Sequence, residues 1–168
     1  MSYQEKKTIV STITGALVLA AYCIQTVGKV RSDVIEMTDL KAWATQMLIF
    51  VGIGIVASIV IQIIFHILIS VSLAVKKTAQ NGKCDNDQIS KSIEVEMVED
   101  EMDKLIQLKS MRISFTVAGF GFITALIWLV INQSAALMLN ILFISFNLGS
   151  ILEGITQIYY YRKGVRNG

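Results

Sequence analysis

The chain contains no proline, one histidine and two cysteines among its 168 residues. Proline is the strongest helix breaker, so in its absence each apolar segment can form a long, continuous helix. A single histidine cannot complete a His-based metal triad, and Cys23 and Cys84 form no C-x-x-C pair. We therefore expect no metal, no cofactor and neither disulfide nor thiol redox chemistry.

Residue patterns typical of catalysis are also missing. One histidine cannot provide a nucleophile with a base and an orienting group. Gly119-Phe120-Gly121 falls inside an apolar segment, without the preceding strand that a nucleotide fingerprint needs. An EF-hand reading of the segment from Asp85 fails, because Ile89 and Ser90 stand where an oxygen ligand and glycine are required. We expect the protein not to be an enzyme.

Long apolar segments dominate what is present: 54% of the residues are hydrophobic and the mean hydropathy is +0.59. Four segments, 8–27, 43–75, 113–132 and 134–159, reach the roughly 20 residues that cross a bilayer. The second segment is longer than a span requires, so its helix must tilt, bend or project past the bilayer. If it bends, we expect the bend at Gly52 and Gly54. The sequence predicts an all-α membrane protein in which residues 1–168 form a single domain, a four-helix transmembrane bundle.

Basic residues outside the spans are distributed unevenly. Two precede the first span, seven lie between the second and third, and three follow the fourth, which makes twelve, against three between the first and second spans. The positive-inside rule then places both termini and the long loop in the cytoplasm. We expect a multi-pass protein of the bacterial cytoplasmic membrane whose basic residues contact the lipid bilayer rather than nucleic acid.

The long loop carries helical periodicity over 88–112, with apolar residues recurring every three or four positions. We expect this segment to be a helix that continues into the third span and extends it into the cytoplasm. Its acidic residues form either a solvated face or a docking surface for a basic partner. The apolar stripe beside them must be buried against another surface, and a second copy of the chain would provide one. The candidate docking residues are Glu99, Asp100, Glu101 and Asp103.

Polar residues recur within two of the spans. His66 lies ten residues before Lys76, and Glu153 lies nine residues before Arg162, so counting from these basic flanks gives the two side chains the same depth. Ionisable residues inside a membrane are costly, and they usually face the bundle interior or a water-filled cavity. We predict a Glu153–His66 pair that serves as a structural contact, a proton or ion site, or a small-ligand site. The full candidate set is Ser58, Gln62, His66 and Ser70 on the second span and Asn140, Asn147, Ser150, Glu153 and Gln157 on the fourth.

Small residues recur at four-residue spacing in several spans. Examples are Ser114 with Ala118, Gly121 with Ala125, and Ser150 with Gly154. Helices in lipid associate through close backbone approach, so these stripes predict helix contacts.

The C-terminal part of the chain, from residue 99 onward, resembles small four-span membrane proteins of unknown function from Gram-positive bacteria. The resemblance is carried by Asp100-Glu101-Met102-Asp103-Lys104-Leu105-Ile106, by Gly149-Ser150-Ile151-Leu152-Glu153-Gly154 and by Tyr159-Tyr160-Tyr161-Arg162-Lys163-Gly164-Val165. Many of those proteins have arginine where this chain has Met102. Because that family has no assigned activity, the resemblance implies location and topology only.

Two classes of function fit these features. The first is a non-catalytic interaction protein with an accessory, immunity or regulatory role, which predicts a homo-oligomer or a complex with a protein partner and a packed, dry bundle. The second is a small transporter or channel that uses the Glu153 and His66 layer. It predicts a water-accessible cavity at that depth.

Overall fold

The computed structural model describes residues 3–31, 39–81 and 100–164, apart from several side chains near the end of the second helix. Within these ranges the chain forms four helices, α1 (Tyr3–Arg31), α2 (Leu40–Asn81), α4 (Glu101–Asn132) and α5 (Ala135–Lys163). Each is long and apolar enough to cross a membrane. For the described residues, the prediction of an all-helical fold with four helices long and apolar enough to span a membrane is confirmed.

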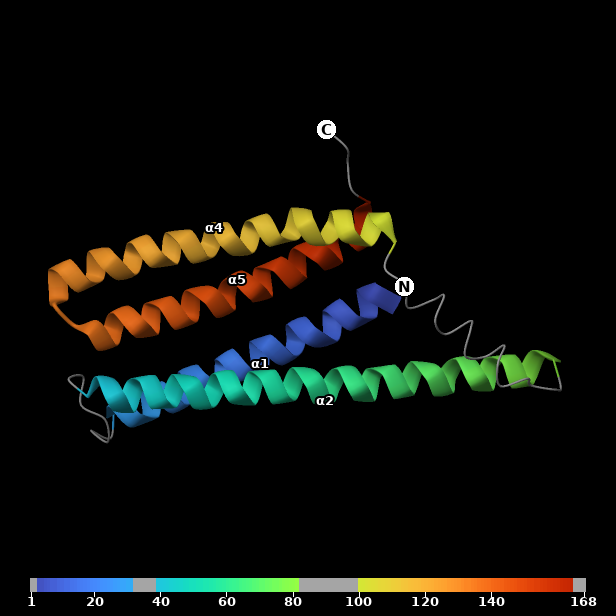
Figure 1. Ribbon diagram of the computed structural model, residues 1–168, viewed down its shortest axis with the longest axis horizontal. Coiled ribbons are helices and arrows are strands. Elements are labelled where there is room, and N and C mark those ends of the chain that lie inside the picture. Colours follow the sequence, from blue (N-terminus) through green and yellow to red (C-terminus); the bar gives the residue numbers. More distant parts are fainter. Residues whose placement is uncertain (1–2, 32–38, 82–99, 165–168) are drawn as a thin grey trace.

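The helices pack in the spatial order α4, α5, α1, α2 (Figure 1). The hairpin of α4 and α5 forms the most extensive contact, α1 packs against α5, and α2 packs mainly against α1. Direct contact between α2 and α5 is slight. The start of α1, the start of α4 and the end of α5 lie at one end of the bundle (Figure 1).

A two-residue turn joins α4 to α5. Gln133 adopts the left-handed conformation (φ 52°), and its backbone N–H donates to the Leu129 carbonyl at 2.9 Å. Ser134 then caps α5, since its side chain accepts a hydrogen bond from the Leu137 backbone N–H. This short connection holds α4 and α5 in a fixed antiparallel register.

Small residues line the contact between α4 and α5, as predicted. Ala118, Gly121 and Ala125 are buried on α4. A Cβ atom added at Gly121 would overlap the side chain of Ser145, and one at Gly149 would lie 2.9 Å from the Ser114 carbonyl oxygen. The two backbones therefore approach each other closely, as in other membrane helix pairs.

A capping box fixes the start of α4 at Glu101. The Asp103 backbone N–H donates to Asp100 Oδ1 at 2.6 Å, and the Asp100 N–H donates to Asp103 Oδ2 at 3.2 Å. Asp100 is extended (φ −82°, ψ 175°), so the expected continuous helix through 88–112 is wrong at this residue. Residues 88–99 lie outside the described ranges. The part of α4 before residue 113 packs beside α5, and α4 is only three residues longer than α5 (32 against 29).

Helix α2 projects instead. The rings of Tyr3 and Phe65 lie 5.5 Å apart between centroids, so Phe65 has the depth of the first described residue of α1. From Phe65 to Asn81 the helix continues for sixteen residues, about 24 Å. It passes through Gly52 and Gly54 without interruption. The excess length of this segment is taken up by projection past α1 (Figure 1) and not by a bend at the glycines.

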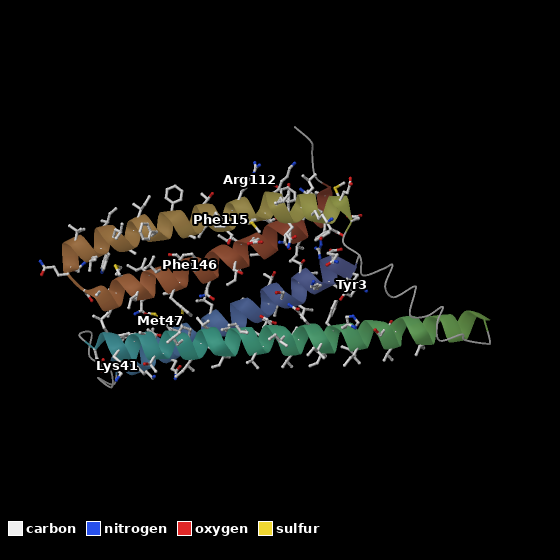
Figure 2. All side chains as sticks on the ribbon, viewed as in Figure 1. Tyr3, Lys41, Met47, Arg112, Phe115 and Phe146 are labelled. Carbon is white, nitrogen blue, oxygen red and sulfur yellow. The ribbon has the colours of Figure 1, made fainter. Side chains whose placement is uncertain are left out.

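Large apolar side chains cover the outer face of the α4–α5 hairpin. Figure 2 shows Arg112 pointing away from α5, and Phe115 on the same helix is 72% exposed. An outward apolar face of this kind suits hydrocarbon as its surroundings.

Candidate functional site

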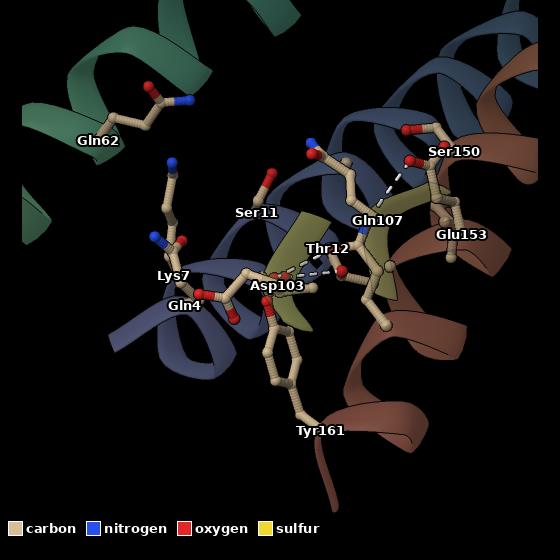
Figure 3. Close-up of a pocket in the computed structure, with 15 residues that line it drawn as sticks. Gln4, Lys7, Ser11, Thr12, Gln62, Asp103, Gln107, Ser150, Glu153 and Tyr161 are labelled. Carbon is tan, nitrogen blue, oxygen red and sulfur yellow. Dashed lines mark hydrogen bonds between the residues drawn. The ribbon is translucent and has the colours of Figure 1, made fainter. Parts of the chain in front are cut away.

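A cavity of about 220 Å³, which we call the vestibule, opens at the end of the bundle where α1 begins (Figure 3). All four helices contribute to it, although α1 and α5 provide most of the lining. Polar groups predominate. The lining residues are Gln4, Lys7, Thr8, Ser11, Thr12, Gly15, Gln62, Asp103, Gln107, Ser150, Ile151, Glu153, Gly154, Gln157 and Tyr161.

Helix α1 supplies the face on which the vestibule is built. Gln4, Thr8, Ser11 and Gly15 recur at three- and four-residue steps, which places them on one side of a helix. This face was not predicted, because the candidate polar residues were assigned to the second and fourth spans only. The spacing of these polar and small residues is the signal that would have revealed it.

Glu153 belongs to a chain of hydrogen bonds between α1 and α5. The Thr8 hydroxyl donates to Gln157 Oε1 at 3.2 Å, and Gln157 Nε2 donates to Glu153 Oε1 at 3.3 Å. One turn away, Thr12 packs so closely against Gly154 that a Cβ atom added at Gly154 would overlap the threonine hydroxyl. The amide of Gln157 therefore orients the carboxylate, and the contact of Thr12 with Gly154 holds the two helices together beneath it.

Three charged residues line the vestibule: Lys7, Asp103 and Glu153. Their formal charges sum to −1, so the lining favours a ligand that carries positive charge. Figure 3 shows Lys7 and Gln62 extending toward each other between α1 and α2. Asp103 also belongs to the capping box of α4.

An ion pair joins α1 to α5 at the same end of the bundle as the vestibule. Arg162 Nε lies 3.1 Å from Glu5 Oε1, and the side chain of Glu5 is only 7% exposed. This pair joins the first turn of α1 to the last turn of α5. Glu5 was not among the predicted site residues, because a carboxylate just before an apolar span is typical of a solvated flank.

Glu153 lies near one end of the bundle rather than at its centre. Because Ser114 abuts Gly149 and the two helices run antiparallel, Arg112 lies within about one turn of the depth of Glu153. Arg112 is exposed on the outer face of α4, where its long side chain can reach the headgroup region (Figure 2). The vestibule therefore extends from about the level of Arg112 to the end of the bundle where α1 begins.

The structure does not form the predicted pair of Glu153 and His66. His66 is exposed, adjoins Phe65 at the depth of Tyr3, and lies outside the residues that line the vestibule. The prediction counted depth from Lys76, but α2 projects past α1, so that flank does not mark the same level. Helix α1 also lies between α2 and α5 (Figure 1).

Other predicted residues are divided among three places. Gln62, Ser150 and Gln157 join Glu153 at the vestibule. Ser70 donates a hydrogen bond to the His66 carbonyl at 2.9 Å, within α2. Asn140 accepts a 2.6 Å hydrogen bond from the Tyr22 hydroxyl at the opposite end of the bundle, and its own Nδ2 donates to the Ala136 carbonyl at 2.9 Å.

The remaining two, Ser58 and Asn147, line a second cavity of about 430 Å³ between α1, α2 and α5, which we call the groove. Asn147 Nδ2 also donates to the Phe143 carbonyl at 2.8 Å. Phe143 and Phe50 provide apolar walls on the two sides of the groove.

An aromatic layer fills the bundle interior beyond the groove. Tyr22 is fully buried, and its ring lies 5.2 Å from Phe50 and 4.3 Å from Phe143 between centroids. Met47 completes this cluster. The vestibule is thus separated from the opposite end of the bundle by packed side chains in this conformation.

The four candidate docking residues have different surroundings. Glu99 lies outside the described residues, and Glu101 is exposed. Asp100 and Asp103 are engaged with each other in the capping box. Two of the four thus shape the start of a helix, which the charge pattern alone did not indicate.

Within the described ranges, no group of three or more histidine, cysteine, aspartate or glutamate side chains could hold a metal ion. The fold and its four apolar helices define a multi-pass membrane protein. No protein family model, curated protein or solved structure matches the chain. The resemblance to small membrane proteins of Gram-positive bacteria is untested by these comparisons and stays a prediction.

Proposed function

We propose that this protein is a small, non-catalytic membrane protein that binds a positively charged solute in the vestibule, as a transporter does. The observation that carries the proposal is the vestibule itself, a polar cavity around the Glu153 carboxylate in an otherwise apolar bundle. A dry, packed bundle would have favoured a purely structural role for these polar residues. Ionisable residues at membrane depth commonly mark solute or proton pathways.

In this proposal the vestibule opens to the cytoplasm of a bacterial cell, and both termini lie on that side. The charge distribution supports the orientation. Lys6, Lys7, Arg162 and Lys163 lie at the vestibule end. Lys29, Arg31 and Lys41 belong to the opposite end, and the positive-inside rule assigns the richer side to the cytoplasm.

Each polar side chain has a distinct role in binding. Glu153 supplies negative charge, and Gln157, itself bonded to Thr8, fixes one of its oxygens. The second carboxylate oxygen and the Ser150 hydroxyl provide further acceptors on the same helix. Transport, in addition to binding, requires the aromatic layer around Tyr22 to open in a second conformation.

Cysteine accessibility tests whether water reaches the vestibule. In a variant without Cys23 and Cys84, Ser150→Cys should react with a membrane-impermeant methanethiosulfonate reagent added at the cytoplasmic face. Leu148→Cys is the matched control, because Leu148 lies two residues away on the outside of α5 and is absent from the vestibule lining. Equal protection at both positions would overturn the proposal.

A binding measurement then tests the role of Glu153. Purified protein in lipid nanodiscs should bind radiolabelled tetramethylammonium saturably, and Glu153→Ala should abolish this binding. In proteoliposomes the same substitution should abolish tetramethylammonium flux. Binding that is unaffected by loss of the carboxylate would show that the cation occupies a different place.

A role as an interaction protein is the second candidate, and the projecting part of α2 favours it. Ile67, Leu68, Val71 and Val75 are exposed there, past the depth at which α1 begins. Contact with a second copy of the chain or with another membrane protein would bury these side chains. Light scattering of the detergent-solubilised protein tests this candidate, because a monomer at all concentrations would exclude the homo-oligomer.

A further inference from the structure

The vestibule and the groove adjoin along α1. Ser11, Gly15 and Ser150 line both cavities. A third, smaller space between α1 and α2 is lined by Gln62, which also faces the vestibule, and by Ser58, which also faces the groove. The groove therefore lies next to the vestibule on the side toward the middle of the bundle.

The two cavities differ in character. The vestibule contains all three charged side chains, whereas the groove has none and is walled by Val18, Phe50, Ile55, Ile59 and Phe143. From Phe50 to Ile59 the groove follows α2 for about 13 Å. Both volumes lie near or within the range of about 300–1,000 Å³ that small-molecule sites commonly have.

This arrangement has the shape and polarity of an amphiphile. A charged head requires polar partners near the aqueous boundary, and the vestibule provides them with a net formal charge of −1. An apolar tail requires apolar side chains that lead inward from the head, and the groove provides them beside a few uncharged polar residues such as Thr14 and Asn147. A cation without an alkyl tail would occupy the vestibule alone and leave the groove without a ligand.

We propose that the solute is a cationic amphiphile, whose head binds beside Glu153 and whose alkyl tail lies in the groove. This proposal deepens the function proposed above and rests on it. The tail contacts α1, α2 and α5 at once, so the amphiphile fills the space left by the slight direct contact between α2 and α5.

The experiment compares radiolabelled dodecyltrimethylammonium with tetramethylammonium on the full chain in nanodiscs, with empty nanodiscs subtracted. The wild-type protein should bind the dodecyl compound at least tenfold more tightly. Gly54→Phe fills the groove from a position that lines neither the vestibule nor the third space, so it should remove most of that advantage and leave tetramethylammonium binding unchanged. Val60→Phe is the control, because Val60 is exposed on α2 and lines none of these cavities.

Glu153→Gln should weaken both cations at least tenfold, and dodecyl sulfate should compete poorly. Two results would overturn this inference: equal affinities for the two cations, or a tighter binding of the dodecyl compound that Gly54→Phe leaves intact. In either case the binding of tetramethylammonium would still uphold the proposed function. Effective competition by dodecyl sulfate would overturn the selection for positive charge. Failure of both cations to bind would overturn the proposed function together with the inference.

Discussion

The two glycines near the middle of α4 give a matched test of the close contact between α4 and α5. Gly121 faces Ser145, whereas Gly119, two residues earlier, has nothing within 4 Å of an added Cβ atom. Gly121→Ala should therefore destabilise the protein, and Gly119→Ala should be neutral or slightly stabilising.

The expected size of the effect follows from two opposing contributions. Replacing glycine by alanine within a helix raises the free energy of unfolding by up to about 1 kcal/mol, and this gain is the same for both variants. Overpacking a tight contact costs about 1–3 kcal/mol, and only Gly121→Ala incurs it. The difference between the two variants should thus be about 1–3 kcal/mol of unfolding free energy.

A compensating substitution identifies the atoms responsible. Ser145→Gly removes the side chain that the new methyl group meets, which leaves the Ser145 Cα at 3.6 Å as its nearest neighbour, an ordinary van der Waals distance. The double variant Gly121→Ala/Ser145→Gly should therefore recover most of the stability lost by Gly121→Ala alone.

Equilibrium unfolding in mixed dodecylmaltoside and dodecyl sulfate micelles, followed by tryptophan fluorescence, measures these differences. Trp128 lies on the same helix and reports on it directly. Equal stabilities of Gly119→Ala and Gly121→Ala would refute the reasoning, as would a double variant no more stable than Gly121→Ala. Either result would mean that α4 and α5 do not meet along this face.

Three further substitutions are assayed by the same unfolding measurement. Tyr22→Phe deprives buried Asn140 of its 2.6 Å hydrogen bond and should cost about 1–3 kcal/mol, and an unchanged stability would contradict the buried bond. Ser110→Ala should be neutral or stabilising by up to about 1 kcal/mol, because the fully buried Ser110 hydroxyl has no hydrogen-bond partner within the described part of the chain, and a clear loss would show that it has one. Glu5→Gln should cost under about 1 kcal/mol, because its partner Arg162 is largely exposed, and a loss of several kcal/mol would make this pair a central support of the fold.

Much of the fold follows from the sequence because hydrocarbon imposes simple rules. Apolar runs of about 20 residues predict the spans, and the small residues at Gly121 and Ala125 predict a close helix contact. Helix ends are less predictable, since they depend on individual side chains. Asp100 and Asp103 act as a capping box, although their charges suggested a docking surface.

The candidate site was predicted in part. Glu153, Gln157, Ser150 and Gln62 do meet, because polar groups at membrane depth gather away from lipid. The partner assigned to Glu153 was wrong, because the depth of His66 depends on how far α2 projects, and sequence spacing carries no information about that.

Other parts of the site depend on long-range pairing. The bond between Thr8 and Gln157 spans 149 residues, and that between Tyr22 and Asn140 spans 118. Each residue has several polar candidates within reach on other spans, so periodicity can place it on a face but cannot select its partner. The packing order of the helices determines which residue becomes the partner.

The position of α1 beside α5 has a consequence for biosynthesis. Helix α1 is made before α5 but finds its main partner only when α5 has been made, since Thr8 and Thr12 meet Gln157 and Gly154. Until then the polar face of α1 lies against lipid or the insertion machinery. Assembly of this bundle is therefore a late, post-insertion event, and any chain that stops before α5 displays an unsatisfied polar surface that membrane quality control can recognise.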